Sequence, residues 1–184
     1  MMQAARLRRR QILGAASALA LLTLARLPVD GARAAEAPAQ APTPAADALW
    51  SSSFKDLNDQ VQPLSQYKGK TTVIYFFATW CVPCHLETPK LVKLYDTFRN
   101  DGVVVIGIAL DNADKVRAFS KKYGVDYPVV YGGREAVQLG RDLGNDQGAI
   151  PFTVVMDKAG HIVETIKGDT PDGKLETVLR PLAG

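Results

Sequence analysis

Cys81 and Cys84 are the residues of this sequence whose type and spacing most clearly suit a chemical task. They are the only cysteines among the 184 residues, and only two residues separate them. A disulfide between them would close so small a loop that it would remove little entropy from the unfolded chain. Because such a bridge would be a poor structural staple, the pair favours reversible thiol–disulfide chemistry over a structural role.

The sequence around the pair predicts a strand, a turn and a helix. Residues 71–78 (TTVIYFFA) form a continuous β-branched and aromatic run, typical of a strand buried on both faces. Pro83 suits the first turn of a helix over residues 83–99. Cys81 would then lie at the helix N-terminus, where free N–H groups favour an anion, and is predicted to be the attacking thiolate. Cys84, one turn deeper on the same side, is predicted to be the less exposed resolving thiol.

The rest of the chain alternates between strand and helix patterns. A hairpin is expected between Ser53 and Leu64, and the last helix at the C-terminus. Further strands are expected over residues 103–110, 127–131, 152–156 and 162–166, and further helices over residues 112–123 and 134–143. This order predicts an α/β fold with a central mixed sheet and helices on both faces. The last two strands, joined by a short turn, must be antiparallel.

Four apolar residues of the 83–99 helix recur at near-helical spacing and are expected to face the core. These residues are Leu86, Leu91, Leu94 and Phe98.

Residues 1–34 have the composition of an export signal. They hold six arginines against one acid, Asp30. Four of the arginines lie between Arg6 and Arg10 and precede an apolar stretch over residues 12–25, which is shorter than the roughly 20 residues of a spanning helix. Residues 32–34 (ARA) match a signal-peptide cleavage pattern, and residues 9–13 (RRQIL) resemble a twin-arginine signal. A Sec signal, a twin-arginine signal and an uncleaved anchor all remain open. Each predicts a periplasmic protein.

The remainder of the chain divides into a tether and a domain. Residues 35–49 are rich in alanine and proline and read as a linker. A single domain is expected over residues 50–184. Without the arginines of the first segment this part is close to neutral, so we expect no nucleic-acid partner.

The run over residues 77–89 (FATWCVPCHLETP) carries a specific family resemblance. It resembles the active-site run of the TlpA/ResA/CcmG group of extracytoplasmic, thioredoxin-like thiol–disulfide oxidoreductases, with a tryptophan before the first cysteine and Glu-x-Pro after the second. The resemblance extends from about Ser53 to Leu182. It includes an extra strand and helix, at about residues 103–123, that minimal thioredoxins lack. It implies a thioredoxin-like fold, a redox-active disulfide and no cofactor.

Glu87 is the third candidate catalytic residue. It follows Cys84 by three positions and so lies on the helical face of both sulfurs. Minimal thioredoxins carry a buried acid six residues before the first cysteine, where this chain has Tyr75. The resemblance favours a buried Glu87 that accepts the proton of the resolving thiol. The alternative is an ordinary solvated glutamate on a helix.

Three further residues are candidates for substrate contact. The resemblance implies that Pro151 follows a cis peptide bond and packs beside the cysteine pair, with Ile150 before it; a trans proline in a plain turn is the alternative. Trp80 is expected to flank the site as an apolar contact surface. His85, four residues after Cys81, could stabilise the thiolate when protonated, but the group carries various polar or basic residues there, so His85 is expected to face the solvent.

The residues between the cysteines suggest the direction of electron flow. Val82 and Pro83 supply neither a charge nor a side-chain donor to stabilise the thiolate, so a low potential and a reductase are expected. The resemblance implies protein disulfides as substrates, in apocytochrome c or in a copper-site protein of oxidase assembly. It also implies a membrane thiol donor as the electron source. We expect a monomer.

Two other functions have weaker support. A peroxiredoxin-like peroxidase would carry Pro-x-x-x-Thr-x-x-Cys, whereas Thr79 stands two rather than three residues before Cys81. A copper-binding metallochaperone would be expected to carry CxxxC, which is absent. A structural zinc site needs four ligands, and only His85 and His161 could complete one. No metal is therefore expected.

Overall fold

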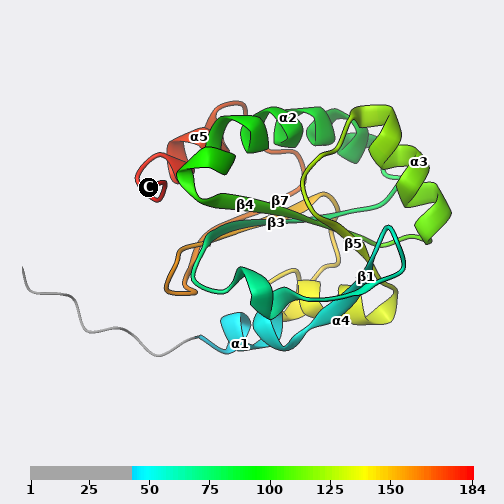
Figure 1. The fold of residues 1–184 in the computed structure, drawn as a ribbon, viewed down its shortest axis with the longest axis horizontal. Helices are drawn as coiled ribbons and strands as arrows, with labels where there is room; N and C mark the ends of the chain where they lie inside the picture. Colours follow the sequence, from blue (N-terminus) through cyan, green and yellow to red (C-terminus); the bar gives the residue numbers. More distant parts are fainter. Residues whose placement is uncertain (1–42) are drawn as a thin grey trace, which may run out of the picture. The chain divides into compact units, whose positions relative to one another are not determined.

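The computed structural model describes residues 43–184, which form a mixed β-sheet with helices on both faces (Figure 1). The export signal predicted for residues 1–34 and the first part of the predicted linker lie outside the described residues. Among residues 43–184, no helix is both long enough and apolar enough to cross a membrane.

The sheet has seven strands in the order β2-β1-β5-β4-β3-β6-β7. Their bounds are β1 (Ser53–Asp56), β2 (Val61–Pro63), β3 (Thr71–Phe77), β4 (Val103–Ala109), β5 (Val129–Tyr131), β6 (Phe152–Met156) and β7 (Ile162–Lys167). β3, β4 and β5 are parallel, and every other pairing is antiparallel. The predicted mixed sheet, N-terminal hairpin and antiparallel final pair are confirmed.

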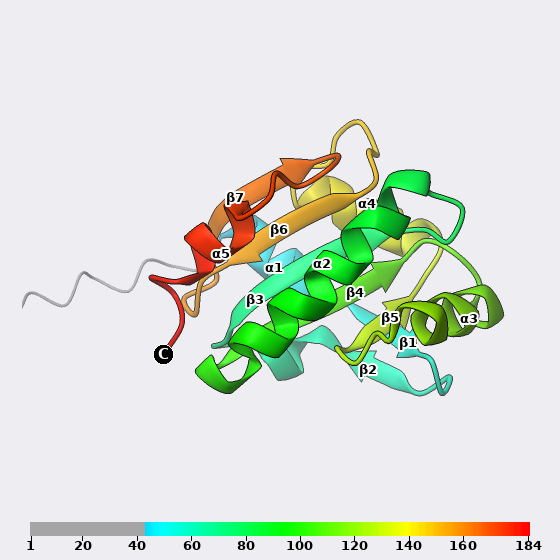
Figure 2. The same ribbon diagram turned by 90° about the horizontal axis from the view of Figure 1, so that it is seen from above.

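The helices divide between the two faces of this sheet. α2 (Val82–Phe98), α3 (Ala113–Tyr123) and α5 (Lys174–Leu179) cover one face, and α1 (Pro44–Ser51) and α4 (Arg134–Asp142) cover the other (Figure 1). Figure 2 shows α2 running across β3 and β4. Alternate residues of β3 enter the two cores, because successive side chains of a strand point to opposite faces. β4 and α3 occupy residues 103–123, where a strand and a helix were expected.

The folded unit begins earlier than predicted. α1 starts at Pro44, with the Thr43 hydroxyl accepting a hydrogen bond from the Ala46 amide as its N-cap. Ala46 and Leu49 are fully buried in the core beneath α4. The predicted linker is therefore wrong for residues 44–49. The alanine-rich composition suggested a tether, but these residues form a short helix whose buried side chains pack into the core.

The apolar stripe predicted on α2 is correct for three of its four members. Leu91, Leu94 and Phe98 are buried against the sheet. Leu86 is 69% exposed and points away from it. The spacing of Leu86 from the other three residues only approximates a helical repeat. In the structure Leu86 lies on the solvent face of the first turns of α2.

Candidate functional site

The two cysteines lie where β3 ends and α2 begins. Cys81 is the N-cap of α2, and Cys84 stands one turn inside it. Their sulfurs are joined in a disulfide with an S–S distance of 2.11 Å. The Cys84 amide donates to the Cys81 sulfur at 3.2 Å, so a backbone N–H of the first helical turn points at this atom. Cys81 is 4% exposed and Cys84 fully buried, the predicted order of accessibility.

An apolar rim surrounds the disulfide on its solvent side. We use this term for Trp80, Val82 and Leu86, which are 67%, 73% and 69% exposed. Large apolar side chains this exposed are unusual when they gather within a few residues of each other. Sequence reasoning singled out Trp80 but missed the other two residues as surface groups. Their signal was the i, i+4 spacing of Val82 and Leu86, which places both on one helical face.

The segment before β6 lies at the same edge of the sheet. Phe152 pairs with Phe76 near the carboxyl end of β3, so the preceding Ile150 and Pro151 reach the level of the cysteines. The Ile150–Pro151 peptide bond is cis, as the resemblance implied. Pro151 is buried and Ile150 is half-buried. The structure thus brings the predicted substrate-contact residues to one edge.

Glu87 is buried on the α5 side of the disulfide. Its side chain is 2% exposed, which contradicts the reading of a solvated glutamate. Oε2 accepts one long hydrogen bond, from the Thr170 amide at 3.4 Å, while Oε1 has no partner among the described residues. The Thr170 hydroxyl also lacks a partner there. A carboxylate so sparsely satisfied is costly to bury, which makes a purely structural role hard to explain.

Behind Glu87, the aromatic residue that replaces the usual buried acid is itself buried. The Tyr75 hydroxyl donates to the Cys84 carbonyl at 3.4 Å and lies 3.5 Å from the Thr88 hydroxyl. Burial, together with the nearby charge of Glu87, raises the pKa of Tyr75 far above its usual range. Tyr75 therefore stays protonated and cannot stand in for the missing acid.

A pocket of about 230 Å³ opens beside Glu87, between α2 and the loop that leads to α5. Glu87 and Thr170 contribute to its wall. Lys90 and Asp172 also line it and form an ion pair at 2.6 Å. Both of these side chains are exposed, so the pair contributes little to stability. Glu87 thus lines a small hollow that opens to the solvent and has charged side chains in its wall.

His85 occupies the opposite, α3 side of the first turns of α2. Its Nδ1 lies 2.6 Å from the Tyr123 hydroxyl and its Nε2 lies 3.0 Å from the Thr79 carbonyl oxygen. The ring also packs against Phe119, with 5.1 Å between centroids. The expected solvent-facing position of His85 is therefore wrong. Its partners come from α3 and from the loop before Cys81, which sequence spacing alone does not relate to His85.

Thr79 is held on its side-chain oxygen as well. Its hydroxyl donates to the Asp111 carboxylate, which also accepts from the Asn112 amide at 2.8 Å. Although burial opposes the shift, these hydrogen bonds and Lys115 lower the pKa of Asp111. The segment from β3 to Cys81 is thus fixed to the loop between β4 and α3.

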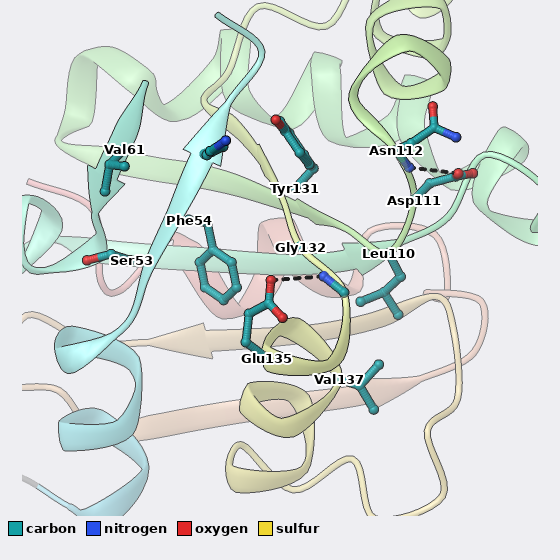
Figure 3. Close-up of a pocket in the computed structure, with 12 residues that line it drawn as sticks. Ser53, Phe54, Val61, Leu110, Asp111, Asn112, Tyr131, Gly132, Glu135 and Val137 are labelled. Atoms are coloured by element: carbon teal, nitrogen blue, oxygen red, sulfur yellow. Dashed lines mark hydrogen bonds between the residues drawn. The ribbon is translucent and has the colours of Figure 1, made fainter. Parts of the chain in front are cut away.

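Asp111 also lines a separate apolar pocket of about 620 Å³ at the carboxyl ends of β4 and β5 (Figure 3). Figure 3 shows Phe54 and Glu135 near Gly132, where a Cβ would come within 2.8 Å of the Phe54 ring. None of its lining residues is a cysteine. Asp111 links this pocket to the segment before Cys81 through its hydrogen bond to Thr79, but neither sulfur lines the pocket, so it is not the reactive site.

The arrangement can support exchange between a thiolate and a disulfide. One sulfur caps a helix and receives an amide N–H, and its partner lies one turn deeper beside a buried carboxylate. Within residues 43–184, no three His, Cys, Asp or Glu side chains gather as a metal site.

Comparisons with known proteins agree with this chemistry. The Redoxin family matches residues 37–179. The chain is 32% identical over 130 residues to the thiol-disulfide oxidoreductase ResA of Bacillus thuringiensis subsp. konkukian, a match covering 69% of this chain and 72% of that protein.

Two solved structures from Chlorobium tepidum extend the comparison to the fold. A thiol:disulfide interchange protein of the thioredoxin family superimposes with a TM-score of 0.65 at 28% identity, covering 79% of this chain and 99% of that one. A putative thiol:disulfide interchange protein DsbE gives a TM-score of 0.63 at 20% identity, covering 72% and 93%. The second likeness concerns the fold alone.

Proposed function

Because this chain belongs to the Redoxin family and is a thiol-disulfide oxidoreductase of the ResA/DsbE type, we propose that it is a periplasmic reductase of particular protein disulfides. The observation that carries the proposal is the Cys84 N–H directed at the Cys81 sulfur at the start of α2. That amide and the helix N-terminus favour a negative charge on Cys81.

The reaction begins with the dithiol form of the protein. The Cys81 thiolate attacks one sulfur of the substrate disulfide, forming a mixed disulfide and releasing the other substrate sulfur as a thiolate that takes a proton. Cys84 then loses its proton and attacks the Cys81 sulfur, which releases the second substrate thiol. Two electrons pass to the substrate, and Cys81–Cys84 becomes the disulfide.

Glu87 is proposed to take the proton from Cys84 in the second step. It is buried one turn beyond Cys84, and one of its oxygens has no partner among the described residues. That free acceptor supports the role of general base. The pocket beside Glu87 offers the proton a route toward the solvent.

Substrate binding is proposed for Trp80 together with Ile150 and Pro151. Trp80 belongs to the exposed apolar rim, and the two residues before β6 lie at the same sheet edge. A partner polypeptide would lie across both. By resemblance, apocytochrome c and copper-site proteins are the proposed substrates, and a membrane thiol protein is the proposed electron donor.

Direction and location complete the proposal. No charged or donor side chain stands between the cysteines, which supports a reducing potential. The basic and apolar residues of 1–34 support export to the periplasm. A potential of about −120 mV, as for the strong oxidant DsbA, would contradict the reductase assignment.

Replacing Cys84 by serine tests the mechanism and identifies the substrate. The Cys84→Ser variant should stall as a mixed disulfide on Cys81, which mass spectrometry of material trapped in the periplasm would identify. Cys81→Ser is the matched control and should trap nothing. Trapping by the Cys81 variant alone would reverse the two roles, and trapping by neither would remove the exchange mechanism.

A further inference from the structure

His85 makes two hydrogen bonds that the exchange reaction itself does not need. Its Nε2 lies 3.0 Å from the Thr79 carbonyl oxygen and its Nδ1 lies 2.6 Å from the Tyr123 hydroxyl. A carbonyl oxygen can only accept, so Nε2 carries the hydrogen. In the neutral ring Nδ1 then accepts from the Tyr123 hydroxyl. The two partners thus specify one tautomer and one ring orientation.

These bonds converge on the short loop that joins β3 to α2. The Thr79 carbonyl is held by His85 of α2, and the Thr79 hydroxyl is held by Asp111 of the loop between β4 and α3. The Cys81 amide closes the turn by donating to the Ala78 carbonyl at 3.2 Å. Tyr123 ties the imidazole to the end of α3. Three separate parts of the fold therefore fix Thr79, which stands two residues before the reactive sulfur.

The residue displayed by this loop is Trp80, which follows Thr79 and is 67% exposed. An exposed tryptophan on an unanchored loop would lose conformational freedom when a substrate bound, and that loss would weaken binding. A loop that is already anchored in the free protein loses less conformational freedom on binding. His85 is close enough to act on the loop, yet none of its hydrogen bonds involves a sulfur.

We propose that His85 is a positioning residue, which holds the loop over residues 79–81 so that Trp80 and the Cys81 sulfur are presented together to a polypeptide disulfide. This inference rests on the proposed function, because it concerns how that site receives its substrate. His85 acts through the Thr79 carbonyl and touches neither the substrate nor the reacting sulfurs. Tyr123 fixes the tautomer that makes the contact.

Two conservative substitutions separate the two nitrogens of His85. In His85→Gln the side-chain amide reaches the position of Nε2 and can still donate to the Thr79 carbonyl. In His85→Asn the shorter side chain can replace only Nδ1, so the loop contact is lost. The full chain would be assayed as a dithiol against two probes, a synthetic peptide disulfide flanked by apolar residues and a small aromatic disulfide.

His85→Asn should raise KM for the peptide about threefold to tenfold, the equivalent of one hydrogen bond, with kcat little changed. His85→Gln should restore KM to within about twofold of the wild type. The small aromatic disulfide, which does not need the apolar rim, should react equally with all three proteins. Equal behaviour of the two variants, or an equal loss toward both probes, would overturn the positioning role.

Two spectroscopic measurements do not depend on catalysis. The chain has two histidines, so nitrogen-15 labelling resolves His85, and the wild type should show hydrogen on Nε2. A Trp50→Phe background leaves Trp80 as the only tryptophan, and its fluorescence anisotropy should fall in His85→Asn but not in His85→Gln. A hydrogen on Nδ1 or an unchanged anisotropy would refute the inference, whereas a wild type that reduces neither probe would refute only the proposed function.

Discussion

The two flanks of the first turns of α2 differ in how completely their polar groups are paired. On the α3 side, both ring nitrogens of His85 have partners within 3.0 Å. On the α5 side, Glu87 has one contact at 3.4 Å, and its second oxygen and the Thr170 hydroxyl have none among the described residues. Buried polar groups in proteins are normally satisfied, so the α5 flank is the exception.

This difference indicates that the α3 flank fixes the geometry of the site, whereas the α5 flank can take part in proton transfer. A fully paired group such as His85 has no free lone pair or proton to exchange, so it fixes geometry. An acceptor without a partner, such as Glu87 Oε1, can receive a proton without first breaking a hydrogen bond. Stability and function should therefore respond in opposite ways to substitutions on the two flanks.

The largest expected effect comes from Glu87→Gln. Removing the proton acceptor should slow the release of the mixed disulfide about 100-fold, the usual range for general-base catalysis. The unfolding free energy should not fall, and it should rise by about 1 kcal/mol if the charge was costly to bury. Stopped-flow kinetics with a peptide disulfide would measure the rate, and urea unfolding the stability.

Glu176→Gln is the matched control, since Glu176 lines the same pocket but is not buried like Glu87. It should change neither quantity. A Glu87→Gln variant that reacts at the wild-type rate, or that loses as much stability as it loses activity, would mean that Glu87 is structural and that the flanks do not differ as described.

The next effect concerns the paired flank. His85→Leu keeps most of the volume against Phe119 but removes both hydrogen bonds, leaving the Thr79 carbonyl and the Tyr123 hydroxyl without their partner. We expect a loss of about 1–2 kcal/mol in unfolding free energy, because two hydrogen bonds between half-buried groups are lost and each is worth about 1 kcal/mol.

Tyr123→Phe provides the graded comparison in urea unfolding. It removes only one of the two bonds and should lose less than His85→Leu. Equal stability of His85→Leu and the wild type would show that the pairing on this flank contributes nothing.

Much of the fold could be predicted from the sequence because its signals are local. The buried run over residues 71–78, the cysteine pair and the proline at the first helical turn specify a strand, a turn and a helix. α1 was missed because the prediction rested on composition, whereas Thr43 and Pro44 are a helix-start signal that composition hides.

The reactive pair could also be predicted, but its surroundings only in part. The position of Glu87 could be predicted because Glu87 shares a helix with Cys84, so the spacing alone sets the direction of its side chain. The contacts of His85 were not, since they depend on where α3 ends relative to α2. Tyr123 lies 38 residues from His85, and no local pattern links them. Long-range side-chain pairing requires the assembled fold.

Two buried threonines near the disulfide allow the same comparison for single hydroxyl groups. The Thr88 hydroxyl donates to the Cys84 carbonyl at 2.8 Å, whereas the Thr170 hydroxyl has no partner among the described residues. Thr88→Val should lose about 1 kcal/mol, and Thr170→Val should lose nothing or gain slightly. Urea unfolding of both variants would measure this, and equal losses would mean that Thr170 has a water partner of similar worth.

The smallest effect tests the second anchor of the loop, the hydrogen bond from Thr79 to Asp111. Thr79→Val should lose about 0.5–1 kcal/mol at neutral pH. The pKa of Asp111 lies below its ordinary value of 3.8 in the folded protein, so the stabilisation is present above that value and is lost as the pH falls through the folded pKa. The unfolding free energies of the variant and the wild type should therefore converge in acid. A difference that persists unchanged below this range would mean that the destabilisation of Thr79→Val does not come from losing a hydrogen bond to an ionised Asp111.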